Sequence, residues 1–140
     1  MFVLDDRLAK DALVVGSFPL CLLLMSRDAN YPWFILVPRR EQFTELYHLD
    51  EGDAAQLARE SRHLSRVLME VFRGDKLNVA ALGNMVPQLH IHHIVRYRSD
   101  PAWPGPVWGA VAPVEFGGEE AARRAALVLD HLGEGFRPGG

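Results

Sequence analysis

Three histidines fall within four positions of the stretch PQLHIHHIV, which spans residues 87–95. The other residues of this stretch are mostly apolar and several are β-branched, a composition typical of a buried β-strand. Because alternate side chains of a strand share a face, we expect Gln88, His90 and His92 to point one way. His93 then points the other way, among apolar neighbours. The pairing of two imidazoles needs a chemical explanation, since two charged rings would repel each other.

Nucleophilic catalysis explains the pairing of His90 and His92. A neutral imidazole can attack phosphorus and form a covalent phosphoramidate, while a second ring donates a hydrogen bond toward phosphate oxygen. The attacking ring needs an acceptor on its other nitrogen to orient it. Residues earlier in the chain could then contact the substrate. Asn78 and Asn84 lie on or beside the neighbouring predicted strand, and Gly83 lets the backbone approach a ligand closely.

Two other hypotheses remain open for these rings. A His-x-His pair on a strand is a common way to present two ligands to zinc or iron, but a catalytic zinc needs about three protein ligands. Asp100 or Glu115 could in principle complete such a site, but their spacing does not single them out. Alternatively the rings are structural, each satisfied by a neighbour. A hydrogen-bonded core or interface ring is the expected role of His93.

Periodicity and turn residues predict the elements that position these side chains. A helix is expected to begin near Asp50 and to stop at Gly74, a natural residue for a helix end. Two apolar runs separated by SRDANYP predict a hairpin, and a short NMVP connection makes the last two strands antiparallel neighbours. We also expect a first helix over 5–13, strands over 18–25, 33–37, 76–83 and 88–97, an ordered tryptophan-proline loop over 99–109, and a last helix over about 118–132.

Composition narrows the class of protein. The chain has 140 residues, 49% of them apolar and 24% charged, which suits one folded domain. Its formal charge of -3 gives no general attraction to nucleic acid or to anionic membranes. The longest apolar stretch, residues 13–25, is shorter than the ~20 residues of a membrane span and follows acidic residues. Its single Cys21 is expected to be a buried thiol. We therefore expect a cytoplasmic protein with no membrane segment and no nucleic-acid partner.

The stretch LNVAALGNMVPQLHIHHIVRYR resembles the signature region of the histidine-triad (HIT) family of nucleotide hydrolases and transferases. The motif of that family is His-φ-His-φ-His-φ-φ, with φ apolar, and here a Val-Pro pair precedes it and Arg96 follows it. Gln88 takes the place of the first histidine, His90 that of the middle one and His92 that of the third. The similarity continues through the hairpin, the long helix and the tryptophan-proline loop, and covers most of residues 14–109.

The resemblance implies a compact α+β domain built on an antiparallel β-meander, with a long helix and a C-terminal helix packed on the sheet. We expect a single HIT-like domain over 1–140, with its core over 14–109 and a flexible tail over 134–140. The family resemblance also implies a homodimer that binds a nucleotide with its phosphate against the histidine strand.

The same resemblance implies a reaction. His90 is expected to attack the α-phosphorus of a nucleotide ester, anhydride or phosphoramidate, dinucleoside polyphosphates among them, while His92 donates to the phosphate. Water then releases the nucleoside monophosphate, and neither a metal nor another cofactor is required. Gln88 can form hydrogen bonds but cannot shuttle protons. A nucleotide-binding module with little catalysis is therefore an alternative, and a metal-dependent hydrolase that uses the His-x-His pair is another.

Further residues are expected around the substrate by the same resemblance. Asn78 and Asn84 match polar positions near ribose and phosphate. The expected binding residues are these two asparagines together with Gly83 and Arg96. Trp103 and Trp108 are expected to rim the site or a dimer contact, because large rings are favoured anchors in both settings.

Overall fold

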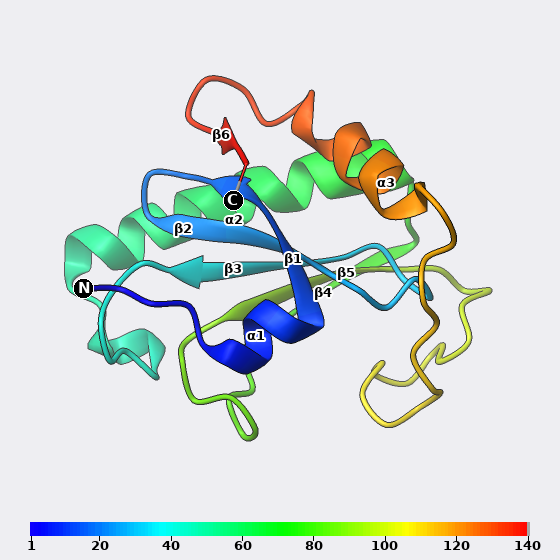
Figure 1. Ribbon diagram of the computed structural model, residues 1–140, viewed down its shortest axis with the longest axis horizontal. Coiled ribbons are helices and arrows are strands. Elements are labelled where there is room, and N and C mark those ends of the chain that lie inside the picture. Colours follow the sequence, from blue (N-terminus) through cyan, green and yellow to red (C-terminus); the bar gives the residue numbers. More distant parts are fainter. Residues whose placement is uncertain (140) are drawn as a thin grey trace.

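The sheet that carries the histidines is antiparallel throughout. In residues 1–139, which the computed structural model describes, six strands are arranged in the order β4-β5-β3-β2-β1-β6 (Figure 1). Every neighbouring pair is antiparallel. The strands are β1 (Ala12–Ser17), β2 (Cys21–Ser26), β3 (Trp33–Pro38), β4 (Lys76–Ala80), β5 (Ile91–Arg96) and β6 (Arg137–Pro138). The α+β fold class with an antiparallel sheet is therefore confirmed.

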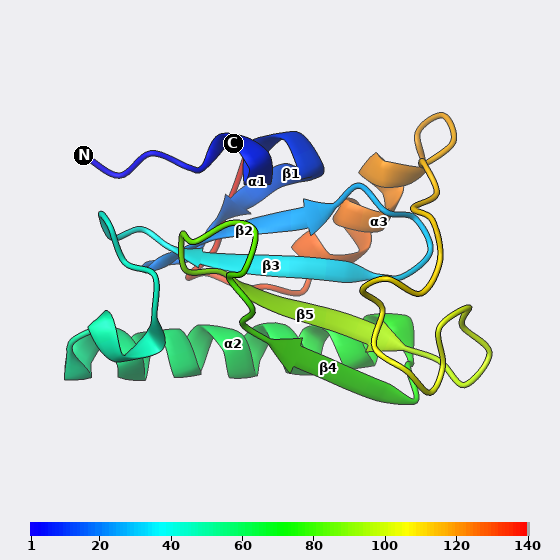
Figure 2. The same ribbon diagram turned by 90° about the horizontal axis from the view of Figure 1, so that it is seen from below.

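Helix α2 (Glu51–Phe72) runs along one face of the sheet, and the short α1 (Asp6–Asp11) lies on the other side (Figure 2). The side chain of Asp50 caps α2 by accepting a hydrogen bond from the backbone N–H of Asp53 at 2.8 Å. The apolar stripe of α2 packs into the main core together with the last helix, α3 (Glu120–Leu129), whose Val128 is fully buried. A single turn of 3-10 helix, η1 (Leu46–His48), precedes α2.

The end of α2 shows why a glycine follows it. Arg73, rather than Gly74, takes the left-handed conformation, with φ 50°. A Cβ at Gly74 would collide with the side chain of Val95 on β5. Gly74 therefore lets α2 turn back closely against the sheet, which places β4 beside β5.

Strand β1 was not predicted: within the apolar run of residues 13–25, the sequence pattern placed a strand only over 18–25. The structure turns this run back on itself between Ser17 and Cys21, where the backbone N–H of Phe18 donates to the carbonyl of Cys21 at 2.8 Å. The register shifts between Val14 and Gly16, which marks an irregularity in β1. Apolar residues on both strands are buried on either face of the sheet, which is why alternation could not separate them from one long run.

The tail expected to be flexible over 134–140 contributes to the sheet instead. Arg137 and Pro138 pair with Ser17 and Gly16, and Phe136 is only 7% exposed. A Cβ at Gly16 would overlap the Phe136 ring, so a glycine in β1 makes room for an aromatic residue from the tail. The part of this expectation that concerns Gly140 lies outside the described residues.

Strand β5 lies between β4 and β3, and all six of its residues are buried. One of its faces packs toward α2. On the other face, Ile94 of β5 packs against Val107 of the loop that follows β5, which is the ordered tryptophan-proline loop expected from the sequence. Among residues 1–139, no helix combines the length and the apolar character needed to cross a bilayer.

Candidate functional site

His90, directly before β5, has one ring nitrogen fixed by the backbone. Its Nδ1 lies 2.7 Å from the carbonyl oxygen of Gln88. A carbonyl can only accept a hydrogen bond, so Nδ1 must carry a proton and donate it. In the neutral ring the lone pair is then on Nε2, for which the structure shows no hydrogen-bond partner within residues 1–139. The arrangement presents Nε2 as a nucleophile or a base.

His92 is the next ring on the same face. The centroids of His90 and His92 are 4.8 Å apart, with the rings at 75° to each other. Trp33, the first residue of β3, places its Nε1 3.0 Å from Nδ1 of His92. Burial, and next the charges that His90 and His93 would carry, lower the pKa of His92 to about 3. His92 is therefore a neutral ring near pH 7.

His93 lies on the opposite face of β5 and is fully buried. Its Nδ1 lies 3.1 Å from the carbonyl of Ile91, and its Nε2 lies 2.7 Å from the hydroxyl of Ser61 on α2. The carbonyl requires a proton on Nδ1, so Nε2 accepts from the Ser61 hydroxyl. Burial lowers the pKa of His93 to about 4. Both of its nitrogens are thus satisfied inside the core.

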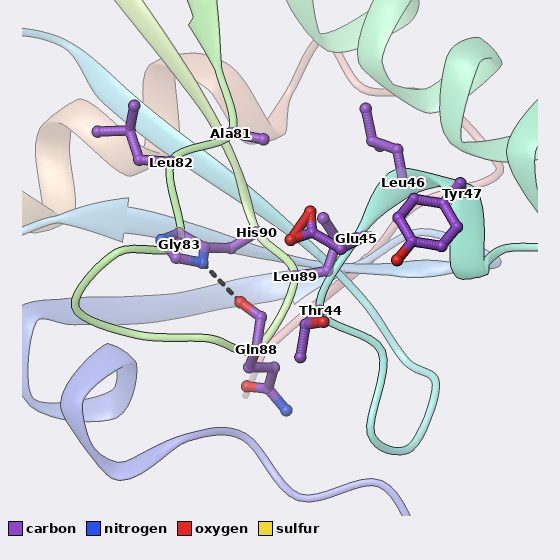
Figure 3. A pocket seen from close by; sticks show the side chains of 10 residues that line it. All are labelled: Thr44, Glu45, Leu46, Tyr47, Ala81, Leu82, Gly83, Gln88, Leu89 and His90. Atoms are coloured by element: carbon purple, nitrogen blue, oxygen red, sulfur yellow. Dashed lines mark hydrogen bonds between the residues drawn. The ribbon is translucent and has the colours of Figure 1, made fainter.

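A cavity of about 290 Å³ opens beside His90 (Figure 3). Its walls come from three segments: residues 44–47 before α2, residues 81–83 after β4, and residues 88–90 before β5. Gly83 has φ 76°, a conformation that side chains rarely adopt, so the turn in this wall depends on glycine. Glu45 supplies a carboxylate to the wall, and it also accepts a hydrogen bond from the backbone of His48.

The side-chain amide of Gln88 is bonded to the N-terminal segment. Its Oε1 accepts from the backbone N–H of Asp5 at 2.8 Å, and its Nε2 donates to the carbonyl of Val3 at 2.9 Å. Figure 3 shows this side chain directed away from His90, while its carbonyl points to the His90 ring. Gln88 therefore orients His90 through its backbone and holds the N-terminal segment through its side chain.

The predicted binding residues Arg96 and Asn78 lie farther along the sheet and bind each other. Arg96 donates to Asn78 Oδ1 at 2.8 Å and forms two hydrogen bonds to Asp100, at 2.8 and 3.0 Å. Burial would raise the pKa of Asp100, but the bonds from Arg96 and the backbone outweigh it and lower that pKa. Arg96 is 1% exposed, and its guanidinium is engaged within the protein rather than directed into the cavity beside His90. These groups anchor the loop after β5.

The structure thus brings His90, Gln88 and Gly83 to one cavity, with His92 beside His90. It does not bring Arg96 or the two asparagines there: Asn84 is exposed on the loop after β4, outside the cavity lining. Trp108 does rim the histidine pair, at 5.1 Å from the His92 ring, whereas Trp103 lies against Arg96.

Sequence reasoning missed Trp33 and the wall formed by residues 44–47. Trp33 and Ile35 alternate along β3, and Ile35 pairs with His92, so period two places the indole on the histidine face. That signal was present in WFILV, but the pairing of β3 with β5 was needed to use it. Residues 44–47 carry no comparable signal, because they lie in the connection before α2, which contains only the single turn of η1.

The part of the chain that the structure describes contains no set of side chains that could bind a metal ion. No group of three or more His, Cys, Asp or Glu side chains in residues 1–139 is arranged to hold an ion. Asp100, one of the two residues considered for such a site, directs both carboxylate oxygens to Arg96.

Comparison with known proteins supports one family. A family model described as HIT domain matches residues 7–99. A histidine triad protein from Bradyrhizobium japonicum superimposes with a TM-score of 0.92 at 44% identity, covering 94% of this chain and 98% of that one. A histidine triad protein from Marinobacter aquaeolei VT8 is 50% identical with a TM-score of 0.89, again over 94% and 98% of the two chains. A HIT protein from Sinorhizobium meliloti 1021 is 38% identical with a TM-score of 0.91, over 94% and 97%. No curated protein matches the chain.

Proposed function

The chain belongs to the HIT family, and from that premise we propose that it is a nucleotide phosphohydrolase or nucleotidyl transferase in which His90 is the nucleophile. Membership supports nucleotide binding and hydrolase or transferase chemistry at the level of the family. The proposal adds a covalent mechanism and assigns it to named residues. The substrate class is a nucleotide phosphate ester, anhydride or phosphoramidate, dinucleoside polyphosphates included.

The observation that carries the proposal is the hydrogen bond between His90 Nδ1 and the carbonyl of Gln88. It holds the ring in one tautomer, so that an in-line attack needs no prior rearrangement of the imidazole. The ring is only 7% exposed, yet it lines a cavity of about 290 Å³. A phosphate group in that cavity would be within reach of Nε2.

The proposed reaction has two displacements at one phosphorus. The lone pair of His90 Nε2 forms an N–P bond, the bond from the α-phosphorus to the leaving oxygen or nitrogen breaks, and the leaving group departs with that electron pair. Water then attacks the phosphorus of the nucleotidyl-histidine, the N–P bond breaks, and His90 recovers its lone pair. The proton that the water loses goes to solvent, and the leaving group takes up its proton from solvent. A second acceptor alcohol or phosphate in place of water makes the same enzyme a transferase.

The neighbouring residues have supporting roles in the proposal. His92, 4.8 Å from His90 between ring centroids, donates to a phosphate oxygen. Gly83 keeps the wall of the cavity close to the substrate. Asn84 is free to meet the nucleotide from its exposed loop. Arg96 and Asn78 act only through the loop that they anchor, since their polar groups already bind each other.

Intact-mass spectrometry after rapid mixing with a nucleotide substrate tests the mechanism. The wild-type protein should gain the mass of one nucleotidyl group, which is a nucleoside monophosphate less one water, and His90→Ala should gain none. His131→Ala is the matched control, because His131 is an exposed histidine on the C-terminal side whose Nδ1 bonds only the Leu127 carbonyl. An adduct of equal yield in His90→Ala would remove His90 from the mechanism.

The second candidate is a protein that binds nucleotides without turning them over. The hydrogen bonds of the Gln88 amide to Val3 and Asp5 favour it. An amide that is held in this way contributes no proton transfer to turnover. Measuring affinity and hydrolysis for the same set of adenosine and guanosine substrates separates the two candidates. Tight binding without hydrolysis would select the binding module.

We also propose a homodimer formed through the edge strand β4. No strand of residues 1–139 pairs with its outer edge, and Val79 on this strand is 50% exposed. Leu46, Tyr47 and Leu82, exposed at 53%, 82% and 49%, extend the apolar surface beside it. Sedimentation analysis should find a dimer for the wild type and a monomer for Val79→Lys. A wild-type monomer at all concentrations would contradict this arrangement.

A further inference from the structure

In the hydrogen bond between Trp33 and His92, it is clear which group donates and which accepts. Trp33 Nε1 lies 3.0 Å from His92 Nδ1, and an indole N–H can only donate. Nδ1 of His92 must therefore accept, which it can do only when it carries no proton. Because burial keeps this ring neutral, its single proton lies on Nε2, on the opposite side of the ring from the indole.

His90 has the opposite tautomer. The carbonyl of Gln88 requires a proton on its Nδ1 and leaves the lone pair on Nε2. The two neighbouring rings thus have different tautomers because their partners differ. A backbone acceptor fixes the tautomer of His90, and a donor from β3 fixes that of His92. His90 can attack an electrophile through Nε2, and His92 can donate a hydrogen bond through Nε2.

The indole that sets His92 is itself held in place. Trp33 meets His92 edge to face, with centroids 5.6 Å apart, and it packs against Trp108 in the same manner at 5.8 Å. Trp108 in turn contacts His92, and Tyr31 packs edge to face against Trp33, with ring centroids 6.3 Å apart. The rings of His92, Trp33 and Trp108 therefore pack against one another in a cluster of three, in which Trp33 forms the hydrogen bond to His92.

We infer that Trp33 is a positioning residue that holds His92 as a hydrogen-bond donor at Nε2, aimed at a phosphate oxygen. That His92 acts on phosphate rests on the proposed function; that Trp33 sets its tautomer rests on the hydrogen bond alone. A donor that is already oriented contributes in the transition state without reorganisation, so losing it should lower kcat more than it changes KM.

Nitrogen NMR of the wild-type protein labelled at histidine tests the tautomer directly. His92 should show an unprotonated Nδ1 and a protonated Nε2, and His90 should show the reverse. Trp33→Phe keeps an aromatic ring but loses the N–H, so His92 should become a mixture of both tautomers. Trp108→Phe is the matched control, because it changes the other tryptophan on His92 and should leave the single tautomer. A proton on His92 Nδ1 in the wild type, or an unchanged single tautomer in Trp33→Phe, would overturn the inference.

Kinetics test the consequence for the reaction. Trp33→Phe should lower kcat by about 100-fold with KM within about threefold of wild type, as for the loss of one donor to a developing anion. Wild-type kcat in Trp33→Phe would overturn the assigned role. A wild-type protein with the expected tautomers but no nucleotidyl adduct would refute the proposed function and His92's role toward phosphate, while the assignment of the tautomer to Trp33 would hold.

Discussion

On the α2 side of β5, His93 has both ring nitrogens hydrogen-bonded and no exposed surface. On the other side, His90 and His92 each have one nitrogen fixed, and for their Nε2 atoms the structure shows no hydrogen bond within residues 1–139. All three rings come from one run of four residues. They differ in what lies beside each ring: the Ser61 hydroxyl of α2 bonds His93, whereas a cavity opens beside His90.

This difference separates a structural histidine from a reactive one more clearly than burial does. His90 and His92 are each 7% exposed, so accessibility alone would place them in the core with His93. Counting the partners of each nitrogen distinguishes them, because a satisfied ring has no atom left for chemistry. If the comparison holds, changes on one face will affect catalysis and changes on the other will affect stability.

The largest effect is expected at the nucleophile. His90→Ala should lower kcat/KM for nucleotide hydrolysis by about 10⁴-fold, a barrier increase of about 5 kcal/mol, because no other group takes over the covalent step. Its thermal unfolding midpoint should stay within a few degrees of wild type. Steady-state kinetics and calorimetry measure both quantities. A variant that unfolds easily but retains its turnover would reverse the assignment of the two faces.

His93→Ala should show the opposite pattern. Removing a fully buried ring leaves a cavity and an unpaired Ser61 hydroxyl, which should cost about 3 kcal/mol in the free energy of unfolding. Urea denaturation measures this loss, and turnover per folded molecule should remain near wild type. Ser61→Ala is the milder control, expected to cost about 1 kcal/mol because it removes the hydrogen bond but keeps the ring.

The two faces differ in how far their organisation can be predicted from sequence. The alternation in LHIHHIV was enough to separate His90 and His92 from His93, because side chains in a strand repeat every two residues. The partners were not predictable in the same way. Trp33 is 59 residues from His92, and the Gln88 amide bonds a segment more than 80 residues away, so both contacts depend on pairings that no local pattern encodes.

Some features were within reach of sequence reasoning and were still missed. Arg96 and Asp100 are four residues apart around a tight turn, a spacing that permits an ion pair, yet the arginine was expected to bind the substrate. Its burial between the rings of Tyr31 and Trp103 depends on the loop after β5. The apolar run of residues 13–25 hid a strand boundary for a different reason: β1 and β2 are apolar on both faces, so the period of two is lost.

Acid should destabilise the protein through the buried rings. The pKa of His93 falls to about 4 on folding, so between pH 6.5 and about 4 the unfolded chain binds a proton that the folded chain does not. Stability is therefore unaffected above pH 6.5 and falls as the pH drops, by about 2 kcal/mol from His93 at pH 5. Urea denaturation across this range measures the slope, and His93→Asn should reduce it. The same slope in His93→Asn would mean that other groups cause the acid sensitivity.

The smallest effect is expected from Gln88→His, the change that gives position 88 the histidine expected there from the sequence motif. The Gln88 amide bonds Asp5 and Val3 with an acceptor and a donor on one planar group, and an imidazole presents these functions on opposite sides of a ring. Gln88→His should therefore lose at least one of these bonds and about 1 kcal/mol of stability. Turnover should not rise, because the side chain at this position is directed away from His90, which it orients through its carbonyl. Gln88→Ala is the control for the lost bonds alone. Faster hydrolysis in Gln88→His than in wild type would show that proton transfer from this position limits the reaction, and that the chemistry of this face extends beyond His90 and His92.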